Sequence, residues 1–292
     1  MLASDPLDLH HQGAERVIGV YLLETADGPA LFDCGPTSCV PALKERLAEQ
    51  GVALTELRHL LLSHIHLDHA GAAGVLVREH PGLQVHVSEI GAPHLIDPSR
   101  LERSARRLYG DTFDTLWGEL APVPEQNLNV VSERVVGLDC WPSPGHASHH
   151  VCYLDGAGTL YAGDAAGVRI VPNRYVFPPT PPPDIDLEAW ERTIDEIERR
   201  ASVRLALIHF GIVDSPRDHL RRLRRELRVW GQRVRQGMSE EEFAEAARAD
   251  LHETDGEEGA AHYERAAPLW QSYAGLKRYW DKQLEAVSKP AD

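Results

Sequence analysis

A short segment with four metal-binding side chains constrains this chain more than any other feature of its sequence. Residues 60–71 read LLLSHIHLDHAG, and their apolar start leads into His64, His66, Asp68 and His69. The apolar start is typical of a buried strand, so we expect a strand that delivers these side chains to a loop. Side chains two residues apart on an extended chain share a face. His64, His66 and Asp68 would then point one way and His69 the other, so that one loop could supply two adjacent metal positions.

Three further candidate ligands follow along the chain. They are His146 in SPGHASHH, Asp164 in LYAGDAAG and His209 in LALIHFG. Each lies beside a short apolar segment and next to glycine or another small residue, which permits a tight turn. Imidazole and carboxylate suit zinc, iron or manganese, and the lack of a thiolate beside them argues against a closed structural zinc site. A chance cluster of histidines with local hydrogen bonds is the alternative, but it would not explain these partners.

The pattern HxHxDH, followed in order by His, Asp and His, resembles the metallo-β-lactamase-fold superfamily over about residues 17–211. Within it, the resemblance is to the hydroxyacylglutathione hydrolase and lactonase-like branch. It implies an α/β fold, a four-layer αβ/βα sandwich, here with a C-terminal helical extension. It also implies two metal positions, with a bridging hydroxide as the nucleophile. The implied ligands are His64, His66 and His146 for one metal, Asp68, His69 and His209 for the other, and Asp164 as the bridge.

The function implied by this resemblance is that of a dinuclear metal hydrolase acting on an ester, a lactone or a thioester. A small phosphoester is a further candidate substrate, because two metals also suit displacement at phosphorus. We expect two divalent metal ions, zinc first, with iron or manganese as alternatives. Asp68 is expected to help shuttle a proton to the leaving group. Tyr175 is a candidate for polarising the substrate carbonyl, as a tyrosine near the metals does in lactonase-like relatives.

Two other classes of protein share parts of this pattern. Iron-dependent persulfide dioxygenases resemble it but use a single iron, whose ligands correspond here to His64, His146 and Asp164. The presence of the remaining ligands favours two metals over one. A non-catalytic binding protein on the same scaffold would be expected to have lost ligands, and none of the seven is missing.

The charge balance and apolar content bear on partners and location. The 292 residues include 30 Lys and Arg against 45 Asp and Glu, a formal net charge of −15. A chain this acidic repels polyanions unless it carries a basic patch, so we expect a small-molecule substrate and no nucleic acid. No segment approaches the roughly 18 apolar residues of a membrane span, and the start lacks the features of a signal peptide. We therefore expect a cytoplasmic protein with no membrane partner.

We expect two domains, a catalytic domain over residues 1–212 and a helical subdomain over 213–292. In the second, residues 215–236 carry apolar side chains at spacings of three and four, which is typical of a helical seam. The seam consists of Leu220, Leu223, Leu227, Trp230 and Val234. We expect it to pack within the chain, with a homodimer as the alternative, and its arginine-rich face to be solvated. Further helices are expected at 239–251 and 260–287, and His219 is expected at the surface.

Two segments are expected near the mouth of the site. Residues 98–120 are helix-like with four arginines and three aromatic residues, and they form either a substrate wall for an anionic group or a solvated helix. Residues 167–183 form a proline-rich loop whose stiffness follows from the fixed φ of proline. Its candidate lining residues are Arg169, Arg174, Tyr175 and Phe177. The alternative is that the two aromatic residues only anchor the loop.

Several polar residues near the ligands are expected to support them. Asp33, in LFDCG, is expected to be structural or to contact a ligand rather than to bind metal. His150 is expected to have the same supporting role, and the role of His149 stays open. The four cysteines have no C-x-x-C spacing and are expected to be buried free thiols.

Overall fold

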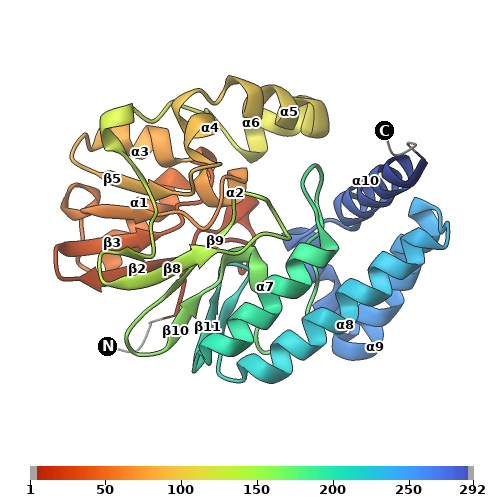
Figure 1. Ribbon diagram of the computed structural model, residues 1–292. Coiled ribbons are helices and arrows are strands. Elements are labelled where there is room, and N and C mark those ends of the chain that lie inside the picture. Colours follow the sequence, from red (N-terminus) through yellow and green to blue (C-terminus); the bar gives the residue numbers. More distant parts are fainter. Residues whose placement is uncertain (1–4, 289–292) are drawn as a thin grey trace.

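The structure, a computed structural model, describes residues 5–288 (Figure 1). Two six-stranded mixed sheets form its centre. The first has the order β1-β2-β3-β4-β5-β6 and the second β12-β11-β10-β9-β8-β7. The strands of the first sheet are β1 Leu7–Asp8, β2 Gly19–Thr25, β3 Gly28–Phe32, β4 His59–Leu61, β5 Gln84–Val87 and β6 Leu128–Val130. Those of the second are β7 Arg134–Val135, β8 Leu138–Pro142, β9 Val151–Leu154, β10 Thr159–Tyr161, β11 Arg204–Leu207 and β12 Gly211–Val213.

Helices cover the outer face of each sheet, so the predicted four-layer sandwich is confirmed. The first sheet is associated with α1 Val40–Glu49, α2 Leu67–Ala70, α3 Ala73–Glu79, α4 Ala92–Ile96, α5 Ser99–Tyr109 and α6 Phe113–Leu116. The second sheet is followed by α7 Leu187–Arg200, α8 Pro216–Arg235, α9 Glu240–Ala266 and α10 Leu269–Ser288. Figure 1 shows α7 and α8 side by side next to β10 and β11, with α9 and α10 beyond them.

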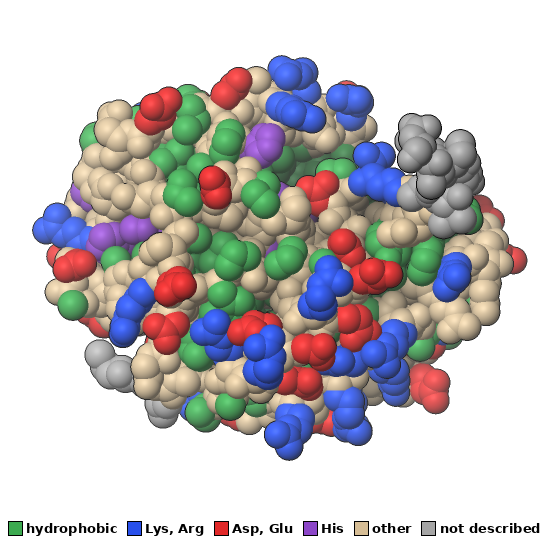
Figure 2. All heavy atoms as spheres, in the orientation of Figure 1, with side chains coloured by type: hydrophobic (Ala, Val, Ile, Leu, Met, Phe, Trp, Pro, Cys, Tyr) green, Lys and Arg blue, Asp and Glu red, His purple; other side chains and the backbone are tan. Residues whose placement is uncertain are grey.

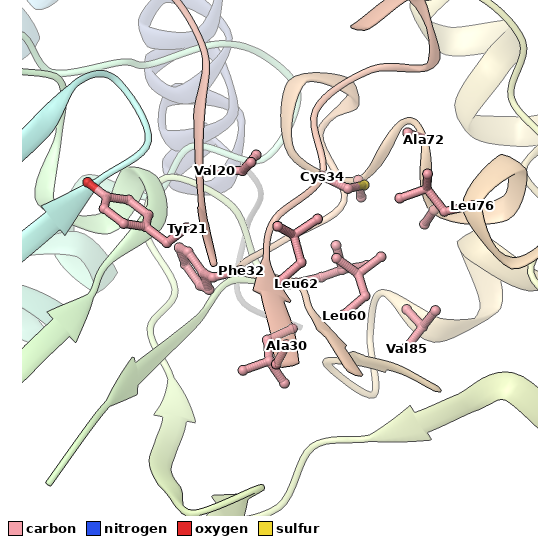
Figure 3. Close-up of a cluster of buried hydrophobic side chains, with 14 of the residues drawn as sticks. Val20, Tyr21, Ala30, Phe32, Cys34, Leu60, Leu62, Ala72, Leu76 and Val85 are labelled. Carbon is pink, nitrogen blue, oxygen red and sulfur yellow. The ribbon is translucent and has the colours of Figure 1, made fainter. Parts of the chain in front are cut away.

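The main apolar core lies between and around the sheets. Phe32 of β3 packs against Tyr153 and Tyr161 of the second sheet, at ring-centre distances of 5.8 and 5.4 Å. Leu60 of β4 and Leu76 of α3 belong to the same buried cluster, and Figure 3 shows them on the other side of the first sheet from Phe32. Strands β3, β4 and β5 are parallel and therefore need both faces covered. Burial on both faces explains why the segment before the ligands is almost continuously apolar.

Helix α7 follows the sequence closely. Its N-cap is Asp186, whose carboxylate accepts a hydrogen bond from the Ala189 N–H at 2.9 Å. A capping carboxylate satisfies one of the free N–H groups of the first turn. Trp190, Ile194 and Ile197 form the buried face, and they pack with the second sheet and with α8.

The helical seam of α8 packs within the chain, as predicted. Leu220, Leu223 and Leu227 join the cluster that contains α7, whereas Trp230 and Val234 join a cluster with Phe243 of α9 and the loop after Asp164. The predicted boundary between residues 212 and 213 falls within β12, just before α8 begins at Pro216. The helices after it share these clusters with the rest of the chain. A homodimer stays a prediction, and it would need a surface other than this seam.

The arginine face of α8 is at the surface but is extensively ion-paired. Arg224 contacts Glu191, Asp195 and Glu198, and Arg228 contacts Glu191. All three acidic residues lie on α7. Figure 2 shows basic and acidic side chains interspersed over this part of the molecule. The face therefore joins α8 to α7.

The last two helices differ from their predicted bounds. A turn at Gly256 interrupts α9 within the predicted gap between residues 251 and 260, because φ 74° and ψ −176° there are not helical and suit glycine. Arg248 before Gly256 pairs with Glu264 after it, so the two halves of α9 fold back on each other and the predicted break is confirmed. Helix α9 ends at Ala266, because Pro268 cannot donate a helical hydrogen bond and disfavours a helical Ala267. Ala267 is extended, with φ −147° and ψ 94°. Helix α10 thus begins at Leu269, nine residues after the predicted start at residue 260.

Two predictions about single residue types have opposite outcomes. All four cysteines are buried free thiols, as predicted. His219 was predicted at the surface, and this is wrong: its side chain is fully buried. Its Nε2 lies 2.7 Å from the Ala166 carbonyl oxygen, because the first turns of α8 cover the turn that carries Asp164.

Within residues 5–288, no helix is both long enough and apolar enough to cross a membrane.

Candidate metal centre

The chain leaves the first sheet just before the ligands, but it does not stay extended. β4 ends at Leu61, His64 and His66 lie in the following loop, and α2 begins at Leu67. The helical turn redirects Asp68, which joins His69 and His209 instead of His64 and His66. The prediction that Asp68 and His69 point in opposite directions is therefore wrong, because the period of two applies only to extended chain.

The first ligand group is formed by three imidazoles. His64 Nε2 lies 2.9 Å from His66 Nδ1. His146 Nε2 lies 3.2 Å from His64 Nε2 and 2.9 Å from His66 Nδ1. Burial lowers the pKa of all three, that of His66 to about 3. The rings are therefore neutral, and neutral imidazole is the form that binds metal.

The second ligand group combines one carboxylate with two imidazoles. Asp68 Oδ2 lies 3.4 Å from His209 Nε2 and 3.8 Å from His69 Nε2. Burial by itself would raise the pKa of Asp68, but His69 and His209 lower it below its ordinary value. Asp68 is thus held as a carboxylate.

Asp164 lies between the two groups. One carboxylate oxygen, Oδ2, is 3.4 Å from His146 Nε2, and the other, Oδ1, is 3.4 Å from His69 Nε2 and 3.7 Å from His209 Nε2. The side chain comes from a 3₁₀ turn, Gly163–Ala166, directly after β10. A carboxylate with one oxygen toward each group is placed to bridge two cations.

Two buried atoms of this cluster have no hydrogen-bond partner in the described part of the chain. They are Nε2 of His69 and Oδ1 of Asp164. Buried polar atoms are normally paired, and leaving one unpaired is costly. Metal ions at the two positions would satisfy both atoms, so the residues present fit such ions.

Outer partners fix which nitrogen faces the cluster in three of the candidate ligand histidines. The Nδ1–H of His146 donates to the Pro179 carbonyl at 2.8 Å, and that of His209 donates to the Val17 carbonyl. The Nδ1–H of His69 donates to Asp33 Oδ2 at 2.7 Å. Each bond occupies Nδ1 and turns Nε2 toward the cluster, which is the usual arrangement around metal-bound histidine.

The expected supporting residues occupy supporting positions. Asp33 is fully buried, and its carboxylate also accepts hydrogen bonds from the Ser63 N–H and hydroxyl, both at 2.7 Å. His150 Nε2 accepts bonds from the backbone N–H groups of Asp164 and Ala165, and so holds the bridging turn. His149 Nδ1 accepts the Ile65 N–H at 3.4 Å and belongs to neither ligand group.

A cavity of about 440 Å³ opens over the cluster. His66, Asp68, His146, Asp164 and His209 line its floor. One wall comes from residues 98–120, as the substrate-wall alternative predicts. Those lining residues are Leu101, Ser104, Ala105, Arg107, Leu108, Tyr109 and Trp117.

The structure does not bring Tyr175 to this cavity. Its hydroxyl donates to Glu226 Oε2 at 2.9 Å and accepts the Trp230 indole N–H at 3.1 Å, and its side chain is 2% exposed. Phe177 packs on Trp230 at 4.7 Å. Both aromatic residues therefore anchor the loop, and the prediction that they line the pocket is wrong. The same loop contributes Val168, Pro179 and three consecutive prolines, 181–183, to the cavity instead.

Several residues of the site were not identified from the sequence. Ser63, Ser143 and Pro179 contact ligand or supporting histidines, and only Ser63 carries a signal, because it directly precedes the motif. Gln271 and Arg278 of α10 also line the cavity. They carry no sequence signal, because they reach the site only through the packing of α10.

Known proteins match more than half of this chain. The sequence model of the metallo-beta-lactamase superfamily matches residues 15–211, more than half of the chain. The metallo-beta-lactamase fold-containing protein ST1585 of Sulfurisphaera tokodaii is 28% identical over 184 residues, covering 58% of this chain and 67% of that protein. The uncharacterized protein YobT of Bacillus subtilis is 27% identical over 164 residues, covering 52% of this chain and 63% of that protein. The matched region thus spans about two thirds or less of these curated relatives.

Solved structures with the same fold extend the match. TTHA1429 of Thermus thermophilus, a metallo-beta-lactamase family protein, superposes with a TM-score of 0.63 at 22% identity over 93% of this chain and 89% of its own. The crystal structure of ST1585 gives a TM-score of 0.60 at 22% identity over 77% of this chain and 84% of its own. At these identities the likeness concerns the fold alone.

Proposed function

This chain belongs to the metallo-β-lactamase superfamily, and we propose that it is a metal-dependent hydrolase that cleaves an ester, a lactone or a thioester. The observation that carries the proposal is the position of Asp164 between two complete ligand groups, with one carboxylate oxygen toward each. Two ligand groups that share a carboxylate support two metal ions rather than one.

The two positions would be held by residues already placed by the fold. The first has His64, His66 and His146, the second has Asp68, His69 and His209, and Asp164 is shared. Zinc is the expected metal, since imidazole and carboxylate suit it. Iron and manganese suit the same donors, and the related structure of TTHA1623 was solved in a di-iron-bound form.

The chemistry of hydrolysis divides between the metals and the chain. Two bound cations would lower the pKa of a shared water and polarise the carbonyl of the substrate. The side chain of Asp68 is 25% exposed and that of Asp164 is 5% exposed, so Asp68 is the more accessible carboxylate. As an ionised group at the cavity floor it can accept a proton from the attacking water and deliver it to the leaving group.

The fold also holds three of the candidate ligand histidines in fixed orientations. Hydrogen bonds to Pro179, Val17 and Asp33 hold the rings of His146, His209 and His69. Because these partners are backbone carbonyls or a buried carboxylate, the rings do not have to reorganise when the substrate arrives. Outer partners of this kind orient the ligands of a metal and tune their basicity.

Metal content tests this proposal directly. We expect close to two ions of zinc, iron or manganese per chain purified without added metal, measured by elemental analysis. His209→Ala should retain close to one ion and lose hydrolysis of model lactones, thioesters and esters. His252→Ala, an exposed histidine on α9, is the matched control and should behave like the wild type. A single iron in the wild type, with oxygen uptake on persulfide substrates, would overturn the hydrolase in favour of a mononuclear dioxygenase.

A further inference from the structure

The charged side chains that line the cavity are separated by sign. Among the described residues these are two carboxylates, Asp68 and Asp164, and two guanidinium groups, Arg107 of α5 and Arg278 of α10. Asp164 is buried and Asp68 is largely so, whereas both arginines are exposed. The carboxylates therefore lie at the floor and the arginines at the mouth.

The two arginines are free of the ion pairs that engage many other arginines of this acidic chain. Arg106, next to Arg107, contacts Glu102 and Asp114. In the described part of the chain, neither Arg107 nor Arg278 has a carboxylate within 4.0 Å. Arg278 is instead held by its Nε–H, which donates to the Pro183 carbonyl at 3.3 Å. Its terminal amino groups are left available to an anion.

Helices α5 and α10 meet at the cavity, which brings the two arginines to one opening. The Gln271 amide donates to the Tyr109 hydroxyl at 3.2 Å, and the rings of Tyr109 and Trp270 lie 6.4 Å apart. Arg278 follows Gln271 by seven residues, two turns along the same face of α10. Arg107 precedes Tyr109 by two residues.

The walls between floor and mouth are mainly apolar, with hydrogen-bond donors among them. Leu101, Leu108 and three consecutive prolines, 181–183, contribute to the apolar part. The indole N–H of Trp117, a donor only, is buried without a partner among the described residues. Burial raises the pKa of Tyr109, so its hydroxyl keeps its proton.

We propose that this cavity takes an acyl substrate with an apolar middle and an anionic far end, which Arg107 and Arg278 bind. The reacting carbonyl would lie at the floor and the anionic group at the mouth, where guanidinium pairs well with carboxylate or phosphate. This inference rests on the proposed function, because it concerns the substrate of the same site.

Ligand binding to metal-free protein tests the inference without any catalytic step. Monomethyl adipate and methyl hexanoate differ in that a carboxylate replaces the terminal methyl group. We expect monomethyl adipate to bind at least tenfold more tightly, measured by the fluorescence of tryptophan, because Trp117 lines the cavity. The preference should shrink as salt is raised, since screening weakens exposed charge pairs. A counterpart that ends in a phosphate monoester shows which anionic group is preferred.

Matched variants separate the two arginines from overall charge. The double variant Arg107→Gln/Arg278→Gln should reduce the preference to less than threefold. Arg192→Gln/Arg217→Gln removes two exposed arginines that do not line the cavity, and it should keep the wild-type preference. Equal binding of both ligands by the wild type, or an unchanged preference in Arg107→Gln/Arg278→Gln, would overturn the inference.

A parallel hydrolysis assay distinguishes this inference from the proposed function. The metal-loaded wild type should cleave mono-4-nitrophenyl adipate with a KM at least tenfold below that for 4-nitrophenyl hexanoate. Binding preference without any ester, lactone or thioester hydrolysis would reject the hydrolase but keep the anion site. Hydrolysis without a preference for the anionic member of either pair would reject the anion site alone.

Discussion

Asp33 and His69 form a fully buried pair in which Asp33 Oδ2 accepts the Nδ1–H of His69 at 2.7 Å. This bond directs His69 Nε2 toward Asp164, where it is otherwise unpaired. Asp33 lies directly after β3 and is held in place by Ser63. The orientation of a candidate ligand therefore depends on a residue from a neighbouring strand end.

Asp33→Asn should weaken metal binding at the second position. The amide keeps the size of the side chain and suits the backbone, whose φ is 54°, but it holds His69 less firmly. Loss of such an outer partner typically costs 10- to 100-fold in metal affinity. Elemental analysis after dialysis against graded chelator measures the retention of each ion. Asp27→Asn, at an exposed position, is the control, and equal retention in both variants would contradict the role of Asp33.

His66→Ala and Asp164→Ala should each abolish hydrolysis, with a loss of at least about 100-fold in kcat/KM. Each removes a group that contacts the other members of the cluster. The fold should remain, because neither side chain belongs to an apolar cluster, and circular dichroism of the variants checks this. Full activity in either variant would rule out the two-metal mechanism.

His219 should make the protein less stable in acid. Burial lowers the pKa of His219 to about 4, against an ordinary value of about 6.5. Between these values the unfolded chain binds a proton that the folded chain does not, so stability falls as pH drops from 6.5 to 4. The full effect is about 3 kcal/mol. Denaturant unfolding at several pH values should show a flatter profile for His219→Gln; profiles that coincide with the wild type would contradict the prediction.

Tyr175→Phe should leave kcat unchanged within about twofold and lower stability instead. Removing the hydroxyl leaves the Trp230 indole N–H and Oε2 of buried Glu226 without their partner, although Arg225 still pairs with Oε1 of Glu226, at a cost of about 1–3 kcal/mol. Steady-state kinetics and denaturant unfolding of the same sample measure both effects. A large loss of kcat with unchanged stability would restore the catalytic role that the sequence suggested.

Trp230→Ala should destabilise the whole molecule by about 3–5 kcal/mol. Its fully buried ring packs against Phe177 at 4.7 Å and Phe243 at 5.1 Å, so it joins α8, α9 and the loop before α7. Trp270→Ala, at a site 38% exposed, should cost less than about 1 kcal/mol. Similar losses in both variants, measured by denaturant unfolding, would show that Trp230 is not central to this cluster.

Local features of the sequence predicted the strand before the ligands and the helix α8 well. Buried strands such as β4 are visible as apolar runs, and the N-cap of α7 is visible as Asp186. The direction of Asp68 was not predictable from spacing, since one helical turn beginning at Leu67 changed the period. The prediction for His219 failed for a related reason: helix periodicity places a residue on a face but does not say what that face covers.

The sequence by itself determined the family, the seven candidate ligands and their order along the chain. Their residue types carry the chemistry, and each follows a strand end that the local pattern reveals. Only the tertiary structure decided what surrounds them: which outer partner holds each histidine, that Tyr175 faces a core, and that Arg107 and Arg278 share one cavity. Tyr109 and Gln271 are 162 residues apart in sequence yet hydrogen-bonded. Such contacts arise from the packing of whole helices, and no local period or composition encodes them.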